Sequence, residues 1–311
     1  MFAGHNGEKV RFGTVFPEGK GAKAIIVVLP GLSEFCEKYY ELAHNLLERD
    51  YAMYVFDWQG QGRSHRHVPK HPQKRVSYGF ENDLKDLSIL IKDYIRPSAM
   101  HPDVGAIPLV MLGHSLGGNI GLRYLHDNPD IFKAAAFSAP FLGLKSLRFM
   151  PAPLQKAIAF FLNEFGDQSY VPGGQEYAAE MRTGAKQQLF SSDDIRGTIH
   201  HKWFEFDHEL QQGNVTWCWV YQAIQSCSIL FNSKYLNKIK IPVLLGIAEK
   251  EFLVSNKRIR RASRHIPNAK LLEIKNARHE ILMETDEIRG VFLKAFDEMM
   301  KKHILSKQNA E

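Results

Sequence analysis

A serine in the pattern Gly-x-Ser-x-Gly could act as a nucleophile in this chain. Residues 113–117 read Gly-His-Ser-Leu-Gly, and a further glycine follows. A serine on a sharp strand-to-helix turn takes a strained backbone conformation, and glycines on both sides leave room for it. An apolar run precedes this segment and a helical pattern follows it, which is the expected context. We predict Ser115 as the nucleophile rather than a simple helix cap, with the N–H of Leu116 as an oxyanion donor.

A serine nucleophile needs a general base, and the base needs an acid to orient it. On a sheet of this kind the chain order is nucleophile, acid, histidine, with the last two on loops after late strands. His279 directly follows the strand-like segment 270–275. The earlier strand-like segment ends before Glu249 and Glu251, either of which could orient an imidazole, and position favours Glu251. The sequence therefore predicts a Ser-His-Glu triad.

A second oxyanion donor is expected in the loop after the first long strand. This loop reads Pro30-Gly-Leu-Ser-Glu34, and Gly31 permits a tight turn that leaves the N–H of Leu32 free to face a reacting carbonyl oxygen. An ordinary strand-ending turn is the alternative. The predicted chemistry is acyl transfer through an acyl-enzyme, and we expect neither a metal nor a cofactor to take part.

Strands and helices alternate along the chain and would position these groups. Each predicted strand is almost entirely apolar, which is typical of a parallel sheet covered on both faces. The predicted strands span residues 23–31, 51–57, 107–113, 133–140, 240–249 and 270–275, and the predicted helices span residues 39–50, 80–94, 115–128, 254–265 and 286–300. The pattern predicts an α/β fold with a mostly parallel sheet.

Residues 141–236 interrupt this alternation and are too many for an ordinary loop. We interpret them as a mostly helical cap inserted between two parts of the core, 1–140 and 237–311. The cap holds 16 of the 35 aromatic residues. Many must form the cap's own small core, but an insertion of this size leaves others to line a cleft suited to one acyl chain.

Composition restricts the class of protein. With 311 residues, 44% hydrophobic and 24% charged, the chain resembles ordinary globular proteins. A net charge of +6 without a basic arm does not indicate a nucleic-acid partner. Three cysteines without a C-x-x-C pair favour neither a disulfide framework nor a zinc site. We see no secretory signal or membrane-spanning run and expect a cytoplasmic protein.

The positive charge is concentrated in the last 75 residues. Residues 237–311 contain 16 basic and 10 acidic side chains, which accounts for the whole excess of +6. The densest group lies in the predicted helix at residues 257–264. Two interpretations are open: a solvated helix face, or peripheral contact with an anionic membrane surface.

The chain resembles α/β-hydrolases of the monoacylglycerol lipase and lysophospholipase group, particularly bacterial lysophospholipases of the L2 type. The matching segments are Pro30-Gly-Leu-Ser-Glu34, Asp57-Trp-Gln-Gly-Gln-Gly-Arg-Ser64, Phe80 to Leu87, the Gly-His-Ser-Leu-Gly-Gly run at 113–118, Ala248-Glu-Lys-Glu251 and His279-Glu-Ile-Leu-Met-Glu284. The resemblance implies an α/β-hydrolase fold with a helical cap, hydrolysis of the ester of a single-chain lipid, and Glu251 as the acid.

The chain departs from this group at one place near the predicted site. Pro30 replaces the usual histidine before the oxyanion glycine, and proline has no N–H to donate. The cap matches too weakly to indicate a particular substrate. A carboxylesterase for small or aromatic esters and a non-catalytic lipid-binding protein of this fold are the alternatives. An epoxide or haloalkane hydrolase would need Asp at position 115 and is disfavoured.

Overall fold

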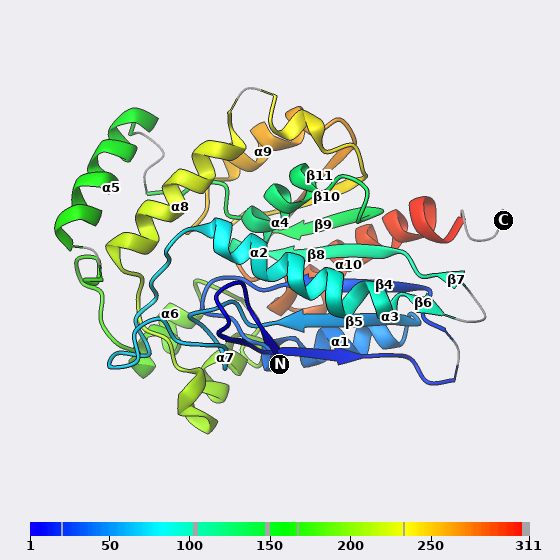
Figure 1. Ribbon diagram of the computed structural model, residues 1–311, viewed down its shortest axis with the longest axis horizontal. Helices are drawn as coiled ribbons and strands as arrows, with labels where there is room; N and C mark the ends of the chain where they lie inside the picture. Colours follow the sequence, from blue (N-terminus) through cyan, green and yellow to red (C-terminus); the bar gives the residue numbers. More distant parts are fainter. Residues whose placement is uncertain (20, 102–104, 147–149, 167, 233, 307–311) are drawn as a thin grey trace.

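The computed structural model describes residues 1–19, 21–101, 105–146, 150–166, 168–232 and 234–306 (Figure 1). Within these residues the centre of the molecule is a seven-stranded sheet in the order β11-β10-β9-β8-β4-β5-β3. Every neighbouring pair is parallel except β3 and β5. The predicted α/β-hydrolase fold class is confirmed.

Six of the seven strands coincide with predicted apolar runs. Five of these, β4, β5, β8, β9 and β10, are buried along their whole length. The bounds are β3 Phe12–Val15, β4 Ala24–Leu29, β5 Tyr51–Phe56, β8 Leu109–His114, β9 Ala134–Ser138, β10 Val243–Ala248 and β11 Ala269–Ile274. The edge strand β3 was not predicted, because its half-exposed residues form no apolar run. Two short antiparallel pairs lie outside the sheet: β1 Phe2–Ala3 with β2 Lys9–Val10, and β6 Met100–His101 with β7 Gly105–Ala106.

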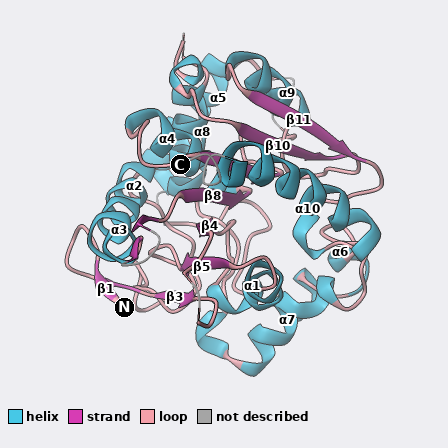
Figure 2. Ribbon diagram, turned by 90° about the vertical axis from the view of Figure 1, so that its right-hand side faces the viewer, coloured by secondary structure: helices cyan, strands magenta, loops and turns pink. Residues whose placement is uncertain are grey.

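Helices cover both faces of the sheet (Figure 2). One face carries α1 Tyr40–Leu47 and α10 Asp286–Met300, which are joined by the ion pair of Glu41 with Arg289. The other carries α2 Phe80–Ile89, α4 Leu116–Asp127 and α9 Asn256–His265. The predicted helix 80–94 continues beyond α2 through a π-helical segment, Leu90–Ile95, into the short α3 Arg96–Ser98.

The segment between β9 and β10 is mainly helical. It contains α5 Ala152–Gly166, α6 Gly184–Gln187, α7 Arg196–Phe206 and α8 Trp217–Leu230. Figure 1 shows α5 and α8 side by side beyond the carboxyl ends of the strands, with α6 and α7 below them. The division at residues 140/141 and 236/237 stays a prediction, and we use "cap" for residues 141–236. None of the described helices combines the length and apolarity needed to cross a membrane.

Two glycines let the helix α4 approach the sheet closely. A Cβ atom at residue 117 would lie 2.0 Å from the carbonyl oxygen of Leu29 in β4. A Cβ at residue 113 would lie 2.9 Å from Cδ1 of Phe137 and 3.0 Å from the backbone of Gly117. Side chains at these positions would push α4 away from the strands. The glycines of the pattern Gly-x-Ser-x-Gly are therefore required by packing.

We predict that Gly117→Ala lowers the free energy of unfolding by about 3 kcal/mol, because the new methyl group overlaps a backbone carbonyl that cannot move aside. Urea denaturation measures the change. Gly290→Ala is the matched control, since Gly290 lies inside α10 with open space around its Cα. That variant should gain up to about 1 kcal/mol from helix propensity. Equal changes in the two variants would contradict the packing argument.

Candidate active site

Ser115 lies on a strained turn between β8 and α4. Its backbone angles are φ 48° and ψ −110°, in a region that residues with side chains rarely adopt. The turn lifts the hydroxyl above the carboxyl edge of the sheet, where Ser115 Oγ lies 3.1 Å from Nε2 of His279. Both side chains are almost fully buried. This is hydrogen-bonding distance for proton transfer from a serine to an imidazole.

The other imidazole nitrogen of His279 faces a carboxylate. His279 Nδ1 lies 2.8 Å from Oε2 of Glu251. The second oxygen, Oε1, accepts hydrogen bonds of 2.9, 2.8 and 3.2 Å from three successive backbone N–H groups, those of residues 252–254. Burial alone raises the pKa of Glu251, but His279 and the backbone donors outweigh it and hold the pKa below the ordinary value. Glu251 is thus ionised and fixed in position.

Glu249, the other predicted candidate, points elsewhere. It is exposed, and its Oε2 accepts a hydrogen bond of 2.8 Å from the backbone N–H of Asn276. The structure brings Ser115, His279 and Glu251 together and leaves Glu249 on the surface.

The two predicted oxyanion residues, Leu32 and Leu116, line the same cavity as Ser115. Leu32 belongs to the loop 30–34, here called the oxyanion loop. The side chains of Trp58 and Gln61 hold this loop in place through hydrogen bonds. Trp58 Nε1 donates to the carbonyl of Pro30 over 2.9 Å. Gln61 donates to the carbonyls of Gly31 (2.9 Å) and Glu34 (2.8 Å), and its oxygen accepts from the N–H of Ser33 (3.2 Å). The loop is therefore anchored although Pro30 offers no side-chain hydrogen bond.

Four buried or nearly buried charged side chains join the oxyanion loop, the cap and residues 275–280, here called the histidine loop because they carry His279. Glu34 accepts from the backbone N–H of Gly31 (2.5 Å) and pairs with Lys38 (2.7 Å). Lys38 also pairs with Glu280 (2.8 Å), the residue after the histidine, and Glu280 pairs with Arg182 of the cap (2.7 Å). Burial raises the pKa of both glutamates, but the adjacent cations outweigh it and lower both values. The chain Glu34–Lys38–Glu280–Arg182 contains two anions and two cations.

His114 packs beside the histidine of the site as an uncharged neighbour. The ring centroids of His114 and His279 are 4.9 Å apart. Nδ1 of His114 lies 3.1 Å from the carbonyl oxygen of Ser138, and burial lowers the pKa of His114 to about 4. It therefore adds no positive charge next to the base.

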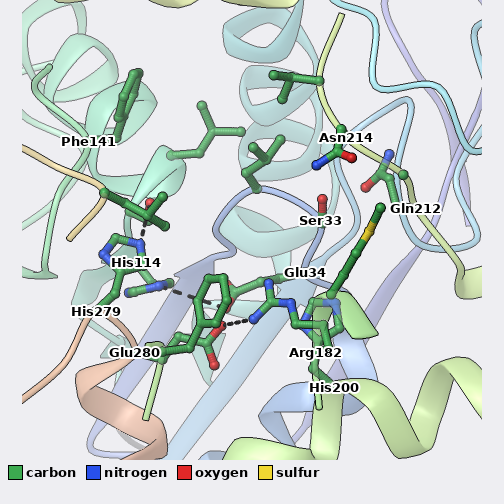
Figure 3. A pocket seen from close by; sticks show the side chains of 18 of the residues that line it. Ser33, Glu34, His114, Phe141, Arg182, His200, Gln212, Asn214, His279 and Glu280 are labelled. Carbon is green, nitrogen blue, oxygen red and sulfur yellow. Dashed lines mark hydrogen bonds and ion pairs between the residues drawn. The ribbon is translucent and has the colours of Figure 1, made fainter. Parts of the chain in front are cut away.

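The cavity above Ser115 has a volume of about 310 Å³ and two unlike walls (Figure 3). Phe141 and Trp219 pack against each other in its wall, and the other apolar lining residues are Leu144, Tyr177, Met181, Phe190, Phe204, Val215, Leu253 and Val254. In the close-up, Ser33, Gln212 and Asn214 lie across the cavity from Phe141 and His279, with Arg182 and His200 below them. The site can thus hold an apolar group on one side and a polar group on the other.

Sequence reasoning missed the polar wall and the buried charges. Glu34 and Lys38 have the i,i+4 spacing of an ion pair, which the sequence could have indicated. Glu280, the second partner of Lys38, is remote in the sequence and could not be paired with it in this way. Arg182, His200 and Gln212 lie in the cap without any recognisable motif.

Comparison with known protein families agrees with this geometry. The model of the family described as "Serine aminopeptidase, S33" matches residues 20–286. The chain belongs to this family. It is a serine hydrolase with the α/β-hydrolase fold, and its resemblance to the lysophospholipase and monoacylglycerol lipase group is confirmed.

Two bacterial relatives match almost the whole chain. A protein of Haemophilus influenzae named probable lysophospholipase L2 is 25% identical over 96% of this chain and 90% of its own length. Lysophospholipase L2 of Escherichia coli is 27% identical over 90% of this chain and 81% of its own length.

Solved structures share the fold. A soluble variant of monoglyceride lipase from Saccharomyces cerevisiae superposes with a TM-score of 0.73 at 21% identity, covering 99% of this chain and 94% of the other. A carboxyl esterase from Bacillus coagulans gives a TM-score of 0.74 at 18% identity, with 97% of both chains covered.

We predict that Glu251→Gln reduces kcat for a p-nitrophenyl ester roughly 10³-fold or more, because the amide cannot stabilise an imidazolium. Glu249→Gln, two residues away and on the surface, should stay within about twofold of the wild type. Circular dichroism of both variants checks that they fold. Similar losses in the two variants, or a larger loss for Glu249→Gln, would refute the assignment of Glu251.

Proposed function

We propose that the protein cleaves carboxylic esters of single-chain lipids through an acyl-enzyme. Ser115 attacks the ester carbonyl while His279 accepts its proton, and Glu251 stabilises the imidazolium. The N–H groups of Leu32 and Leu116 stabilise the oxyanion. His279 then protonates the leaving alcohol, and a water molecule activated by the same histidine releases the fatty acid. The observation that carries the proposal is the hydrogen-bonded row Ser115–His279–Glu251 at the floor of the cavity.

The substrate class rests on the shape of the cavity and on the relatives. The apolar side is built by Phe141 and Trp219 together with aliphatic residues, and it is large enough to accept part of an acyl chain. The relatives named above are lysophospholipases and a monoglyceride lipase. A monoacylglycerol or a lysophospholipid fits both observations, since each combines one acyl chain with a polar headgroup.

A carboxylesterase for small or aromatic esters is the second candidate, because the carboxyl esterase from Bacillus coagulans superposes well. A series of p-nitrophenyl esters from acetate to palmitate separates the two. Activity that rises to medium or long chains supports the lipid substrate, and activity confined to acetate or butyrate supports the esterase.

We predict covalent labelling of Ser115 by a fluorophosphonate probe, because the base and the oxyanion donors that activate serine toward esters also activate it toward phosphorus electrophiles. Labelling should disappear in Ser115→Ala and persist in Ser33→Ala, which removes the other serine of the cavity wall. Gel fluorescence gives the measurement. A folded wild-type protein that takes no label would contradict the enzymatic proposal and favour a non-catalytic lipid-binding protein.

We also propose peripheral contact between helix α9 and an anionic membrane. Lys257, Arg261 and Arg264 are exposed and follow the spacing of one helix face. Arg260 is instead paired with Glu273. Arg258 and Arg261 lie over the ring of Phe231 at the end of α8, and α5, whose Leu154, Phe160 and Phe161 are exposed, packs along α8. Basic and apolar surface thus occur on neighbouring elements.

We predict that the protein sediments with vesicles containing phosphatidylglycerol and that about 0.5 M salt releases most of it, because screening weakens contacts between exposed charges. Lys257→Glu combined with Arg264→Glu should weaken sedimentation, whereas Lys23→Glu, directly before β4, should not. Salt-independent sedimentation would assign membrane contact to apolar side chains instead.

A further inference from the structure

A second cavity, separate from the one above Ser115, lies beside residues 75–83 at the start of α2. Its volume is about 190 Å³, roughly six times the ~30 Å³ that one water molecule occupies in the liquid. Among the described residues, none that lines this cavity also lines the one above Ser115. Polar side chains form most of its wall, including those of His5, Arg75 and Asp83. The cavity therefore has room for a small hydrophilic molecule.

The guanidinium of Arg75 is buried with one edge unused. Only 1% of the residue is exposed, and Nη1 donates to the carbonyls of Gln59 (3.1 Å) and Val76 (3.0 Å). Among the described residues, neither Nε nor Nη2 has a hydrogen-bond partner. These two nitrogens form an edge of the guanidinium whose parallel N–H bonds match the two oxygens of a carboxylate or phosphate. Because buried donors without a partner cost free energy, this edge indicates an anionic group as its ligand.

A buried carboxylate lines the same cavity. Asp83 is 7% exposed, and no hydrogen bond or ion pair engages its oxygens within the described part of the chain. Burial raises the pKa of Asp83 to about 7, although the positive charge of Arg75 opposes the rise. A cation placed against this carboxylate would favour its ionised form, so the group that complements Asp83 is a positively charged donor.

The histidines of the wall do not compensate these two charges. His5 and His65 each contact another carboxylate, at 2.8 and 3.0 Å. His67 adds no positive charge, because burial and the nearby Arg75 lower its pKa to about 3. The cavity thus has one buried cation and one buried anion in its wall, Arg75 and Asp83, each without a directly bonded partner of opposite charge among the described residues.

We propose that this cavity binds a compact zwitterion, with its anionic oxygens on Arg75 and its ammonium group on Asp83. A simple anion would balance Arg75 but face the carboxylate of Asp83, and a simple cation would face the guanidinium. A zwitterion completes both groups without adding net charge to a buried site. A free amino acid and the phosphoethanolamine headgroup of a lipid share this chemistry. The proposed site does not depend on ester hydrolysis at Ser115.

The test is isothermal titration calorimetry of the wild-type protein with glycine, glycerophosphoethanolamine, acetate and ethylammonium. The last two carry only one of the two charges. We expect at least one zwitterion to bind, and acetate and ethylammonium to bind at least roughly tenfold more weakly, because each lacks the hydrogen bonds to one charged partner. Tighter binding of glycine would assign the site to free amino acids, and tighter binding of glycerophosphoethanolamine would assign it to a lipid headgroup. A protein that binds neither zwitterion, or binds acetate equally well, would overturn the proposal.

Conservative variants locate the binding. Arg75→Lys keeps the charge but loses the paired N–H edge, and Asp83→Asn keeps the shape but loses the charge. Each should raise Kd roughly tenfold or more. Arg49→Lys and Asp297→Asn alter a partly exposed ion pair elsewhere and should leave Kd within about twofold. Equal effects in the two pairs of variants would also overturn the proposal.

Thermal unfolding checks that the four variants fold. Neither zwitterion contains a carboxylic ester, so calorimetry reports binding whether or not the protein hydrolyses esters. A wild-type protein that cleaves p-nitrophenyl esters but binds no zwitterion would contradict this site alone. A protein that binds glycine or glycerophosphoethanolamine but cleaves no ester would contradict only the proposed function.

Discussion

The buried chain Glu34–Lys38–Glu280–Arg182 is the interaction on which the site depends. Each member comes from a different part of the molecule: the oxyanion loop, the turn before α1, the histidine loop and the cap. Removing one partner of a buried ion pair is far more costly than the pair is stabilising, so the four side chains hold one arrangement. Because Glu34 also accepts from the N–H of Gly31, that arrangement fixes the oxyanion loop relative to His279. Through Arg182, the cap is joined directly to the residue that follows His279.

Two kinds of constraint meet at Ser115. From below, the glycines at 113 and 117 let α4 approach β4, which forces the serine into its positive-φ turn. From above, the cavity separates apolar from polar surface on the two sides of the hydroxyl. The sheet thus determines where the bond is cleaved, and the cap determines which molecule is oriented there.

The core could be predicted from sequence because its strands are continuous apolar runs and its motifs consist of residues close together in the chain. The apolar runs of β4, β5, β8, β9 and β10 are visible residue by residue, and the chain order of nucleophile, acid and histidine on such a fold places an acid before His279. Glu251 could be preferred over Glu249 by position alone. The contribution of His200 and Gln212 to the cavity could not be predicted, because only the tertiary packing of the cap brings them to it. β3 was missed for a related reason, since a half-exposed edge strand gives a weak signal.

The position of β10 in the sheet has a consequence for how the chain folds. β10 lies between β9 and β11, yet the whole cap separates it from β9 along the chain. During synthesis from the N-terminus, the first five strands of the sheet can pair while the edge of β9 stays open until residues 243–248 emerge. Such long-range pairing is slow, and an open apolar edge can aggregate. Glu251 and His279 also emerge late, so the proposed triad can assemble around Ser115 only when the last part of the chain has been synthesised.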